Sequence, residues 1–268
     1  MQAIRVGAVN YLNTKPLIYN LDSPSLELTL DVPSELADQL AVGELDVALI
    51  PVIEHFRAGN YRVIPDMSIA SDGPVLSVTL FSRVPWDQIR SVALDEGSRT
   101  SVALTKILLQ KRSQIEPSFV NLPLDANPEE LETDAVLLIG DRAMRACLPG
   151  FAHAFDLGLE WTRWTRLPFV YAFWSVREGV DLEGAEEILL RAKQEGCRHV
   201  GEIAQREAPL LGLDAGFCRR YLETLIRFDL GEREIEGLQR YYELASELGI
   251  APTGRELEFY ESPQLEPA

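Results

Sequence analysis

The sequence has little of the chemistry that builds metal sites or covalent active sites. Its three histidines and three cysteines are scattered over 268 residues, without the C-x-x-C or H-E-x-x-H spacing of metal sites. The odd number of cysteines argues against a disulfide framework and favours a reducing compartment. The motifs G-x-S-x-G, G-x-G-x-x-G and the P-loop are missing too, which excludes the usual hydrolases, dinucleotide enzymes and nucleoside triphosphatases. We therefore expect no metal site.

Positive charge and long apolar runs are also scarce. Lys and Arg number 25 against 42 Asp and Glu, a net charge of -17, so most of the surface repels phosphate backbones and anionic lipid. Nucleic acid and membranes are therefore not expected partners. No apolar run approaches the roughly 18 residues that span a bilayer. The N-terminus enters a strand-like pattern without an export signal, which predicts a cytoplasmic protein.

The acidic excess is unevenly distributed. The net charge is -6 over residues 1–80, -2 over residues 81–166 and -9 over residues 167–268. A cleft needs only a few donors of the right sign to hold a small anion, so the overall charge does not exclude such a ligand. Residues 81–166 have the smallest net negative charge of the three parts and therefore repel an anion least.

The hydrophobic pattern predicts an α/β protein. With 46% hydrophobic and 25% charged residues, the chain is ordinarily globular. Short apolar runs alternate with helical patterns, as in βαβ units around parallel sheets. The predicted strands are residues 4–9, 26–31, 45–51, 61–64, 75–82, 92–94, 118–121, 135–139 and 167–176. The predicted helices start at Pro16 and Pro33 and cover residues 53–56 and 101–111, followed by three helical segments after residue 183.

Two long apolar strands suggest a two-lobed molecule. We interpret residues 75–82 as the crossing into a second lobe and residues 167–176 as the return strand. This interpretation makes residues 1–80 with 167–268 one lobe, residues 81–166 the other, and the C-terminal part a helical segment. Ligands in such folds bind near the carboxyl ends of strands, so we expect an interlobe cleft.

The segment Gly97-Ser98-Arg99-Thr100-Ser101 precedes a predicted helix and is the best local signal for a ligand. Free N–H groups at a helix N-terminus attract anions, and a guanidinium matches a carboxylate with two hydrogen bonds. The alternative is ordinary capping by Ser98 or Thr100, with Arg99 in solvent. The sequence leaves both interpretations open.

Residues of three further segments have the same ambiguity between structure and ligand binding. Residues 10–16 follow the first strand, and within them Asn13 and Thr14 either cap a helix or face a ligand. Ser77 lies in an otherwise apolar strand, so its hydroxyl either bonds the backbone or lines the cleft. Asp141 follows a buried strand and either caps the next helix or points into the cleft.

Five ordered stretches resemble the MqnA family, the chorismate dehydratases of the futalosine route to menaquinone. They are V-G-A-V-N-Y-L-N-T-K-P-L at residues 6–17, S-D-G-P-V-L-S at 71–77, G-S-R-T-S at 97–101, L-I-G-D at 138–141 and L-P-F-V at 167–170. The resemblance implies a two-lobed, type II periplasmic-binding-protein-like fold used as a cytoplasmic enzyme without cofactor. It also implies loss of water from chorismate to give 3-[(1-carboxyvinyl)oxy]benzoate.

The resemblance also implies roles for matched residues. Asn13 resembles the family's cleft asparagine and is the predicted catalytic residue, while Ser77, Ser98, Arg99, Thr100 and Ser101 resemble groups that hold the substrate. Asn10 is a further candidate. The base that removes the proton from ring carbon C3 is either the enolpyruvyl carboxylate of the substrate or a protein carboxylate such as Asp141.

Two other functions stay open at this point. The same fold serves solute-binding proteins for small carboxylates, and the related enzyme that forms cyclic dehypoxanthine futalosine shares it.

Overall fold

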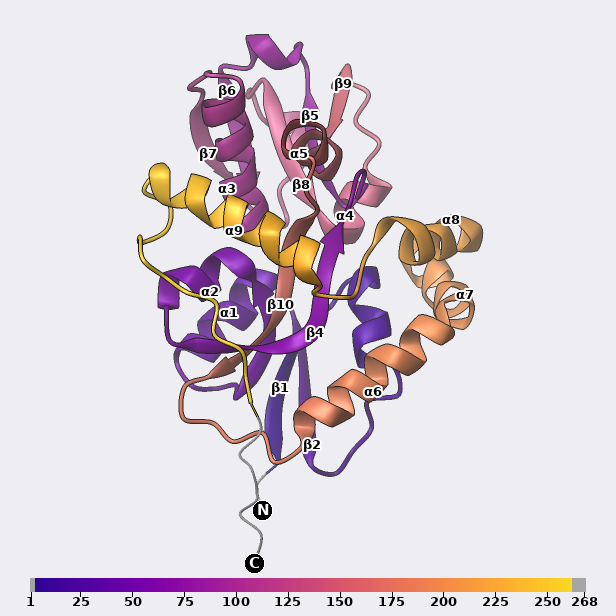
Figure 1. Cartoon of the computed structure of the whole chain (residues 1–268). Coiled ribbons are helices and arrows are strands. Elements are labelled where there is room, and N and C mark those ends of the chain that lie inside the picture. Colours follow the sequence, from indigo (N-terminus) through magenta and orange to yellow (C-terminus); the bar gives the residue numbers. More distant parts are fainter. Residues whose placement is uncertain (1–2, 262–268) are drawn as a thin grey trace, which may run out of the picture.

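The computed structural model describes residues 3–261 and contains two five-stranded sheets, one above the other in Figure 1. The strand orders are β2-β1-β3-β10-β4 in the first sheet and β7-β6-β8-β5-β9 in the second. The first sheet consists of β1 (Ile4–Val9), β2 (Leu26–Asp31), β3 (Val47–Pro51), β4 (Tyr61–Ser71) and β10 (Phe169–Arg177). The second consists of β5 (Val78–Ser82), β6 (Ser91–Asp95), β7 (Ser118–Leu122), β8 (Ala135–Ile139) and β9 (His153–Asp156).

Both sheets mix parallel and antiparallel pairs. β1 runs parallel to β2 and β3, and β6 runs parallel to β7 and β8, as the alternating sequence pattern predicts. The return strand β10 is inserted antiparallel between β3 and β4, and β5 is antiparallel to β8 and β9. The carboxyl ends of β1, β3, β6 and β8 border the space between the sheets, because residues that end or directly follow these strands line one cavity there.

Helices pack on both sheets. Those of eight or more residues are α1 (Pro33–Ala41), α3 (Thr100–Ile107), α5 (Leu157–Thr165), α6 (Ala185–Arg198), α7 (Val200–Leu211) and α9 (Glu232–Glu247). The shorter ones are α2 (Val52–Ala58), α4 (Gly140–Arg145) and α8 (Ala215–Arg220). Three short segments are 3₁₀-helices: η1 (Leu12–Ile18), η2 (Trp86–Gln88) and η4 (Pro128–Glu130). Two more are single π-helical turns: η3 (Leu108–Arg112) and η5 (Tyr221–Leu225). In residues 3–261, no helix is both long enough and apolar enough to cross a membrane.

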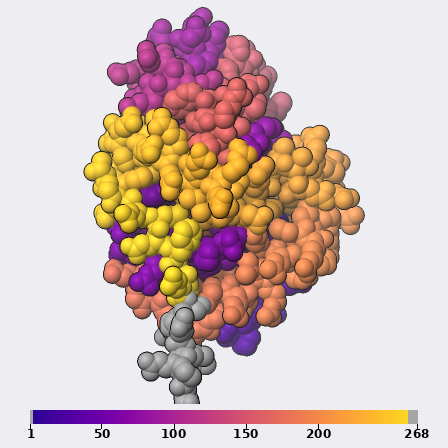
Figure 2. Space-filling view, in the orientation of Figure 1, coloured from indigo at the N-terminus to yellow at the C-terminus, as the bar shows by residue number. Residues whose placement is uncertain are grey.

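The C-terminal segment covers the region where the two sheets meet. In Figure 1, α9 runs between the upper and lower sheets, and Figure 2 shows the yellow residues across the front of the molecule. The Tyr241 hydroxyl in α9 donates a hydrogen bond to the Thr100 carbonyl at 3.1 Å, and both residues are buried. Gly196 in α6 packs against the backbone of Pro16, where a Cβ would overlap the carbonyl. The predicted helical segment therefore ties parts of both sheets together.

The strand predicted over residues 75–82 is wrong at its start. β5 begins at Val78, while β4 continues to Ser71 instead of ending near residue 64. Leu76 has a φ of +60°, and the Ser77 N–H donates to the Val75 carbonyl at 2.7 Å, which makes a tight turn. The N–H groups of Val75 and Leu76 donate to the Asp156 carboxylate at 2.8 and 2.7 Å. The Asp156 carboxylate, rather than a neighbouring strand, therefore accepts these two N–H groups, and the strand starts only at Val78.

The helix predicted to start at Pro16 begins earlier. η1 starts at Leu12, and Pro16 lies inside it. The Leu12 N–H donates to the Asp141 carboxylate at 3.1 Å, which satisfies a free N–H in the first turn. The strand prediction also missed β9, a four-residue strand that pairs with β5 at the edge of the second sheet. The predicted helix over residues 101–111 is confirmed with a start one residue earlier, and its last turn is the wider turn η3.

Candidate functional site

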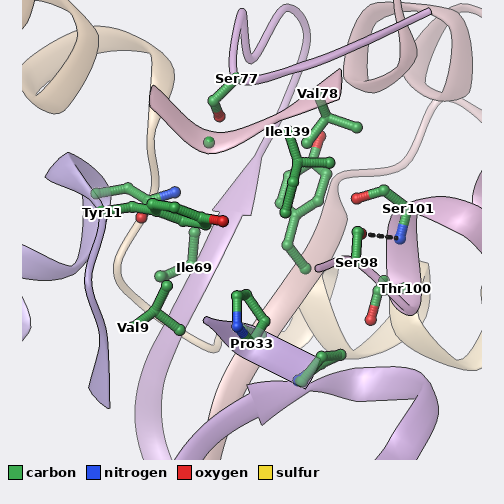
Figure 3. Close-up of a pocket in the computed structure, with 15 residues that line it drawn as sticks. Val9, Tyr11, Pro33, Ile69, Ser77, Val78, Ser98, Thr100, Ser101 and Ile139 are labelled. Atoms are coloured by element: carbon green, nitrogen blue, oxygen red, sulfur yellow. Dashed lines mark hydrogen bonds between the residues drawn. The ribbon is translucent and has the colours of Figure 1, made fainter. Parts of the chain in front are cut away.

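One cavity lies between the two sheets and has a free volume of about 60 Å³. This is smaller than the roughly 300–1,000 Å³ of small-molecule sites, so a ligand of that size requires the cavity to widen. Figure 3 shows side chains from both sheets converging on it. The lining residues are Val9, Tyr11, Asn13, Pro33, Pro51, Ile69, Ser77, Val78, Ser98, Thr100, Ser101, Ile139, Gly140, Tyr171 and Ala172.

One wall of the cavity is the N-terminus of α3. Ser98, Thr100 and Ser101 all line it, and all three are buried. The Ser98 hydroxyl accepts the Ser101 N–H at 3.3 Å, drawn as the dashed line in Figure 3. Asp95 holds the preceding turn by accepting the Gly97 N–H at 3.0 Å. Ser98 therefore satisfies a free N–H in the first turn of α3, and the same residues also face the cavity.

The wall opposite is built by Tyr11, whose ring Figure 3 shows across the cavity from Ser98 and Thr100. The ring lies against Gly140, which has a φ of +58°, and a Cβ there would be 2.8 Å from three ring carbons. Burial, and after it the charges of Asp95 and Asp141, raise the pKa of the Tyr11 hydroxyl above its usual range. Tyr11 therefore stays a neutral hydroxyl at physiological pH.

Asn13 and Ser77 reach the cavity from two different segments. Asn13 lies in η1, and Ser77 lies in the turn before β5. Ser77 is 2% exposed, and its hydroxyl accepts a hydrogen bond from Tyr221 at 2.8 Å. The Asn13 Oδ1 atom is buried and has no hydrogen-bond partner among residues 3–261. An unpaired buried acceptor is costly, so this oxygen is a ready partner for a donor on a ligand.

Arg99 is not among the lining residues. Its guanidinium pairs with Asp38 of α1 at 2.6 Å and with Glu54 of α2 at 3.2 Å. These two carboxylates belong to helices beside the first sheet, whereas Arg99 precedes α3 beside the second. The Arg99 guanidinium therefore forms ion pairs between the two halves. Ser98 and Thr100, which flank Arg99 in the sequence and were predicted to bind the same ligand, line the cavity instead.

Asn10 and Asp141 also lie outside the lining set. Asn10 is exposed, and its side chain accepts a hydrogen bond from Lys15 at 3.4 Å. Asp141 is 7% exposed, and burial raises the pKa of its carboxyl. The prediction that Asp141 caps the helix after it is wrong, because Asp141 lies within α4 and accepts the N–H of Leu12 in η1. A sequence pattern does not show a contact between residues 129 positions apart.

The apolar part of the cavity was not predicted residue by residue. Tyr171 in β10 lines it and shares a hydrogen bond of 3.0 Å with Ser71. Pro33 and Pro51 line it from the start of α1 and the end of β3. The sequence signal that was available was the position of Pro33 and Pro51 near the carboxyl ends of strands, where α/β proteins build their sites.

All the lining residues are uncharged at neutral pH. The set contains no carboxylate, imidazole, ammonium or guanidinium group, and burial raises the pKa of the Tyr171 hydroxyl well above its usual range. An anion bound here would meet hydroxyl groups, one amide and the N-terminus of α3. The arrangement can hold and orient a small anion with an apolar body, and it offers no strong base.

Comparison with known proteins agrees with the five sequence motifs. The profile of a family described as menaquinone biosynthesis matches residues 4–247. A chorismate dehydratase of Thermus thermophilus is 32% identical over 271 residues, covering 94% of this chain and 98% of the relative. A chorismate dehydratase of Campylobacter jejuni is 28% identical over 253 residues, covering 91% of this chain and 99% of the relative. The predicted family resemblance is confirmed.

The fold is similar to that of periplasmic binding proteins. The structure of the periplasmic aliphatic sulphonate binding protein of Escherichia coli matches with a TM-score of 0.64 at 17% identity, covering 100% of this chain and 95% of that one. The predicted periplasmic-binding-protein-like α/β fold is therefore confirmed. At this identity the likeness concerns the fold alone.

Proposed function

We propose that this chain, which belongs to the menaquinone biosynthesis family, is a chorismate dehydratase. The reaction removes the hydroxyl at C4 of chorismate and the proton at C3, and gives 3-[(1-carboxyvinyl)oxy]benzoate. The C3–H bond is acidified through the ring alkene conjugated to the C1 carboxylate, and the product ring is aromatic. The proposal locates the reaction in the cavity between the two sheets.

The lining residues match the two parts of this substrate. Chorismate has two carboxylates, which need hydrogen-bond donors, and a ring, which needs apolar walls. Ser98, Thr100 and Ser101 at the start of α3 are the proposed donors for one carboxylate. Ser77 is the proposed donor for the other. Val9, Ile69 and Ile139 are the proposed walls for the ring.

Asn13 is the proposed catalytic residue. Its unpaired, buried Oδ1 is an acceptor, so it suits a hydroxyl donor better than a carboxylate. We assign it to the C4 hydroxyl, which it holds in the orientation for departure. We assign the N–H of the same amide to the negative charge that develops on the ring in the transition state.

The assignment of the base follows from the uncharged lining of the cavity. No lining residue is a base at neutral pH. Asp141 lies outside the lining set, and one of its carboxylate oxygens accepts a hydrogen bond from the Leu12 N–H. The enolpyruvyl carboxylate of chorismate is therefore the proposed base for the C3 proton. The protein's part is to hold this carboxylate over C3 and to exclude water.

The two halves are proposed to close around the substrate. We take residues 1–77 with 167–268 as one lobe and residues 78–166 as the other, because β5 (Val78–Ser82) pairs within the second sheet and the boundary predicted after residue 80 would divide it. The crossing turn before β5 and the segment before β10 join the two lobes. Residues from both lobes line the cavity, so a ligand that contacts both favours the closed form. We also propose that the enzyme acts in the cytoplasm, in keeping with its free cysteines Cys147, Cys197 and Cys218.

Incubation of the purified protein with chorismate, followed by mass spectrometry of the product, tests the proposal. Formation of a product lighter by one water, with the spectrum of a substituted benzoate, is expected. A protein that binds chorismate and raises its own melting temperature without turnover would instead be a carboxylate-binding protein. No product in any buffer would overturn the enzymatic assignment.

A further inference from the structure

Tyr221 is a fully buried residue of the C-terminal segment that contacts the site without lining it. It begins η5, is 1% exposed, and donates a hydrogen bond of 2.8 Å to the Ser77 hydroxyl. The two residues are 144 positions apart in the chain. Burial raises the pKa of Tyr221 above its usual range, so its hydroxyl keeps its proton.

The bond from Tyr221 determines what the Ser77 hydroxyl can do. A hydroxyl has one proton, and Ser77 Oγ already accepts from Tyr221. Among residues 3–261 no hydrogen bond takes the Ser77 proton, and Ser77 lines the cavity. The proton is therefore free to be donated into the cavity. A hydroxyl that accepts one hydrogen bond also becomes a stronger donor.

Asn13 influences the same tyrosine. The Asn13 side chain lowers the pKa of the Tyr221 hydroxyl, against the larger opposite effect of burial. The Asn13 Oδ1 atom has no hydrogen-bond partner among residues 3–261 and is an open acceptor. The hydrogen bond by which Tyr221 orients a group of the cavity is therefore the one to Ser77.

We propose that Tyr221 is a positioning residue of the site, which aims the Ser77 proton at the substrate. The inference rests on the proposed function. It gives the C-terminal segment a part in catalysis, because η5 carries the hydroxyl that holds Ser77. The ligand chemistry that fits this oriented donor is a carboxylate.

A double-mutant cycle between Tyr221 and Ser77 tests the inference. Tyr221→Phe removes only the hydroxyl, and kcat/KM for chorismate is expected to fall at least about tenfold. In a Ser77→Ala background the same change is expected to cost less than about threefold, because its main partner is already gone. A merely structural tyrosine would lower kcat/KM by the same factor in both backgrounds, and that result would overturn the inference.

Tyr260→Phe is the matched control. Tyr260 is also buried, and its hydroxyl accepts the Leu182 N–H at 2.9 Å, but it does not contact the cavity. Its loss is expected to leave kcat and KM within about twofold of the parent while lowering the melting temperature. If the parent enzyme does not turn over chorismate, the proposed function fails and the inference with it. Normal kinetics of Tyr221→Phe beside an active parent would overturn the inference alone.

A second measurement keeps the inference testable if Tyr221→Phe does not fold. A fluorinated tyrosine, introduced at position 221 alone, keeps the ring and the hydroxyl. Its fluorine resonance is expected to move when chorismate is added to the parent, and to move less in the Ser77→Ala protein. An equal movement in both proteins, or none in either, would contradict a link between the Tyr221 hydroxyl and the bound ligand.

Discussion

Asp141 Oδ1 accepts a hydrogen bond from the Leu12 backbone N–H at 3.1 Å. This bond joins α4, beside the second sheet, to the turn that carries Asn13, beside the first. Both residues are buried, and Asp141 does not line the cavity. The carboxylate therefore supports the position of Asn13 rather than facing the substrate.

The kinetics of Asp141 and Asn13 variants are expected to separate these two roles. Asp141→Asn keeps an oxygen that accepts the Leu12 N–H, so kcat is expected to stay within about threefold of the parent. Asn13→Ala removes the open acceptor, and kcat is expected to fall about 100-fold. Steady-state assays with chorismate measure both. A loss of about 100-fold or more in Asp141→Asn would identify Asp141 as the base and contradict the proposed substrate carboxylate.

Gly140→Ala is expected to damage the cavity through Tyr11. The new Cβ would lie 2.8 Å from the Tyr11 ring, at a φ of +58° that disfavours side chains. We expect kcat/KM to fall at least about tenfold and the protein to lose about 1–3 kcal/mol of stability. Steady-state kinetics and urea unfolding measure the two effects.

Gly201→Ala is the control for this change. Gly201 lies inside α7, and a Cβ added to it would meet no heavy atom within 4 Å. The substitution is expected to add about 0.5–1 kcal/mol of stability without changing kcat/KM. Equal effects of the two substitutions would show that the Tyr11 contact has no functional importance.

Arg99→Gln is expected to weaken the link between the halves more than it weakens substrate binding. The change breaks the ion pairs with Asp38 and Glu54, which are partly exposed and together are worth about 1 kcal/mol. We expect a lower melting temperature and a KM for chorismate within about threefold of the parent. The exposed pair of Arg219 and Glu223 gives a control, Arg219→Gln, with neither effect. A roughly tenfold rise in KM at unchanged stability would instead place Arg99 on the substrate.

His55 is expected to make the protein acid-sensitive. Burial lowers its pKa from 6.5 to about 4, and its Nδ1 lies 3.2 Å from the Ser175 hydroxyl. The folded state therefore favours the neutral ring. The stability that depends on this neutral ring is fully present above the unfolded pKa of 6.5 and is lost as the pH falls from there toward 4. At about pH 5 the loss is about 2 kcal/mol.

Urea unfolding at about pH 7.5 and about pH 5 measures this effect. His55→Gln has no titrating ring, so its stability is expected to fall by about 2 kcal/mol less than that of the parent over this interval. Carboxylates that titrate in the same range are common to both proteins and cancel in the comparison. Identical pH dependence of the two proteins would rule out a buried neutral His55.

Local sequence patterns predicted the elements whose partners are close along the chain. β1, β2 and β8 have the predicted bounds. β1 and β8 are largely apolar runs inside a sheet, and β2 alternates apolar and polar residues at a sheet edge. Gly43, with a φ of +78°, follows the end of the helix predicted from Pro33. Local patterns failed at residues 75–77, because the partner of the Val75 and Leu76 N–H groups is Asp156, 81 and 80 positions away.

Motifs in the amino-acid sequence supply the chemical groups of the site, which are amides, hydroxyls and a helix N-terminus, and they identify the family. Folding selects which of these groups share the cavity. It brought Asn13, Ser77 and Ser98 together and turned Arg99 toward Asp38 and Glu54. It also added Tyr221, whose hydrogen bond to Ser77 no local pattern predicts. Hydrogen bonds and ion pairs act over a few ångströms in space, and only the folded chain establishes those distances.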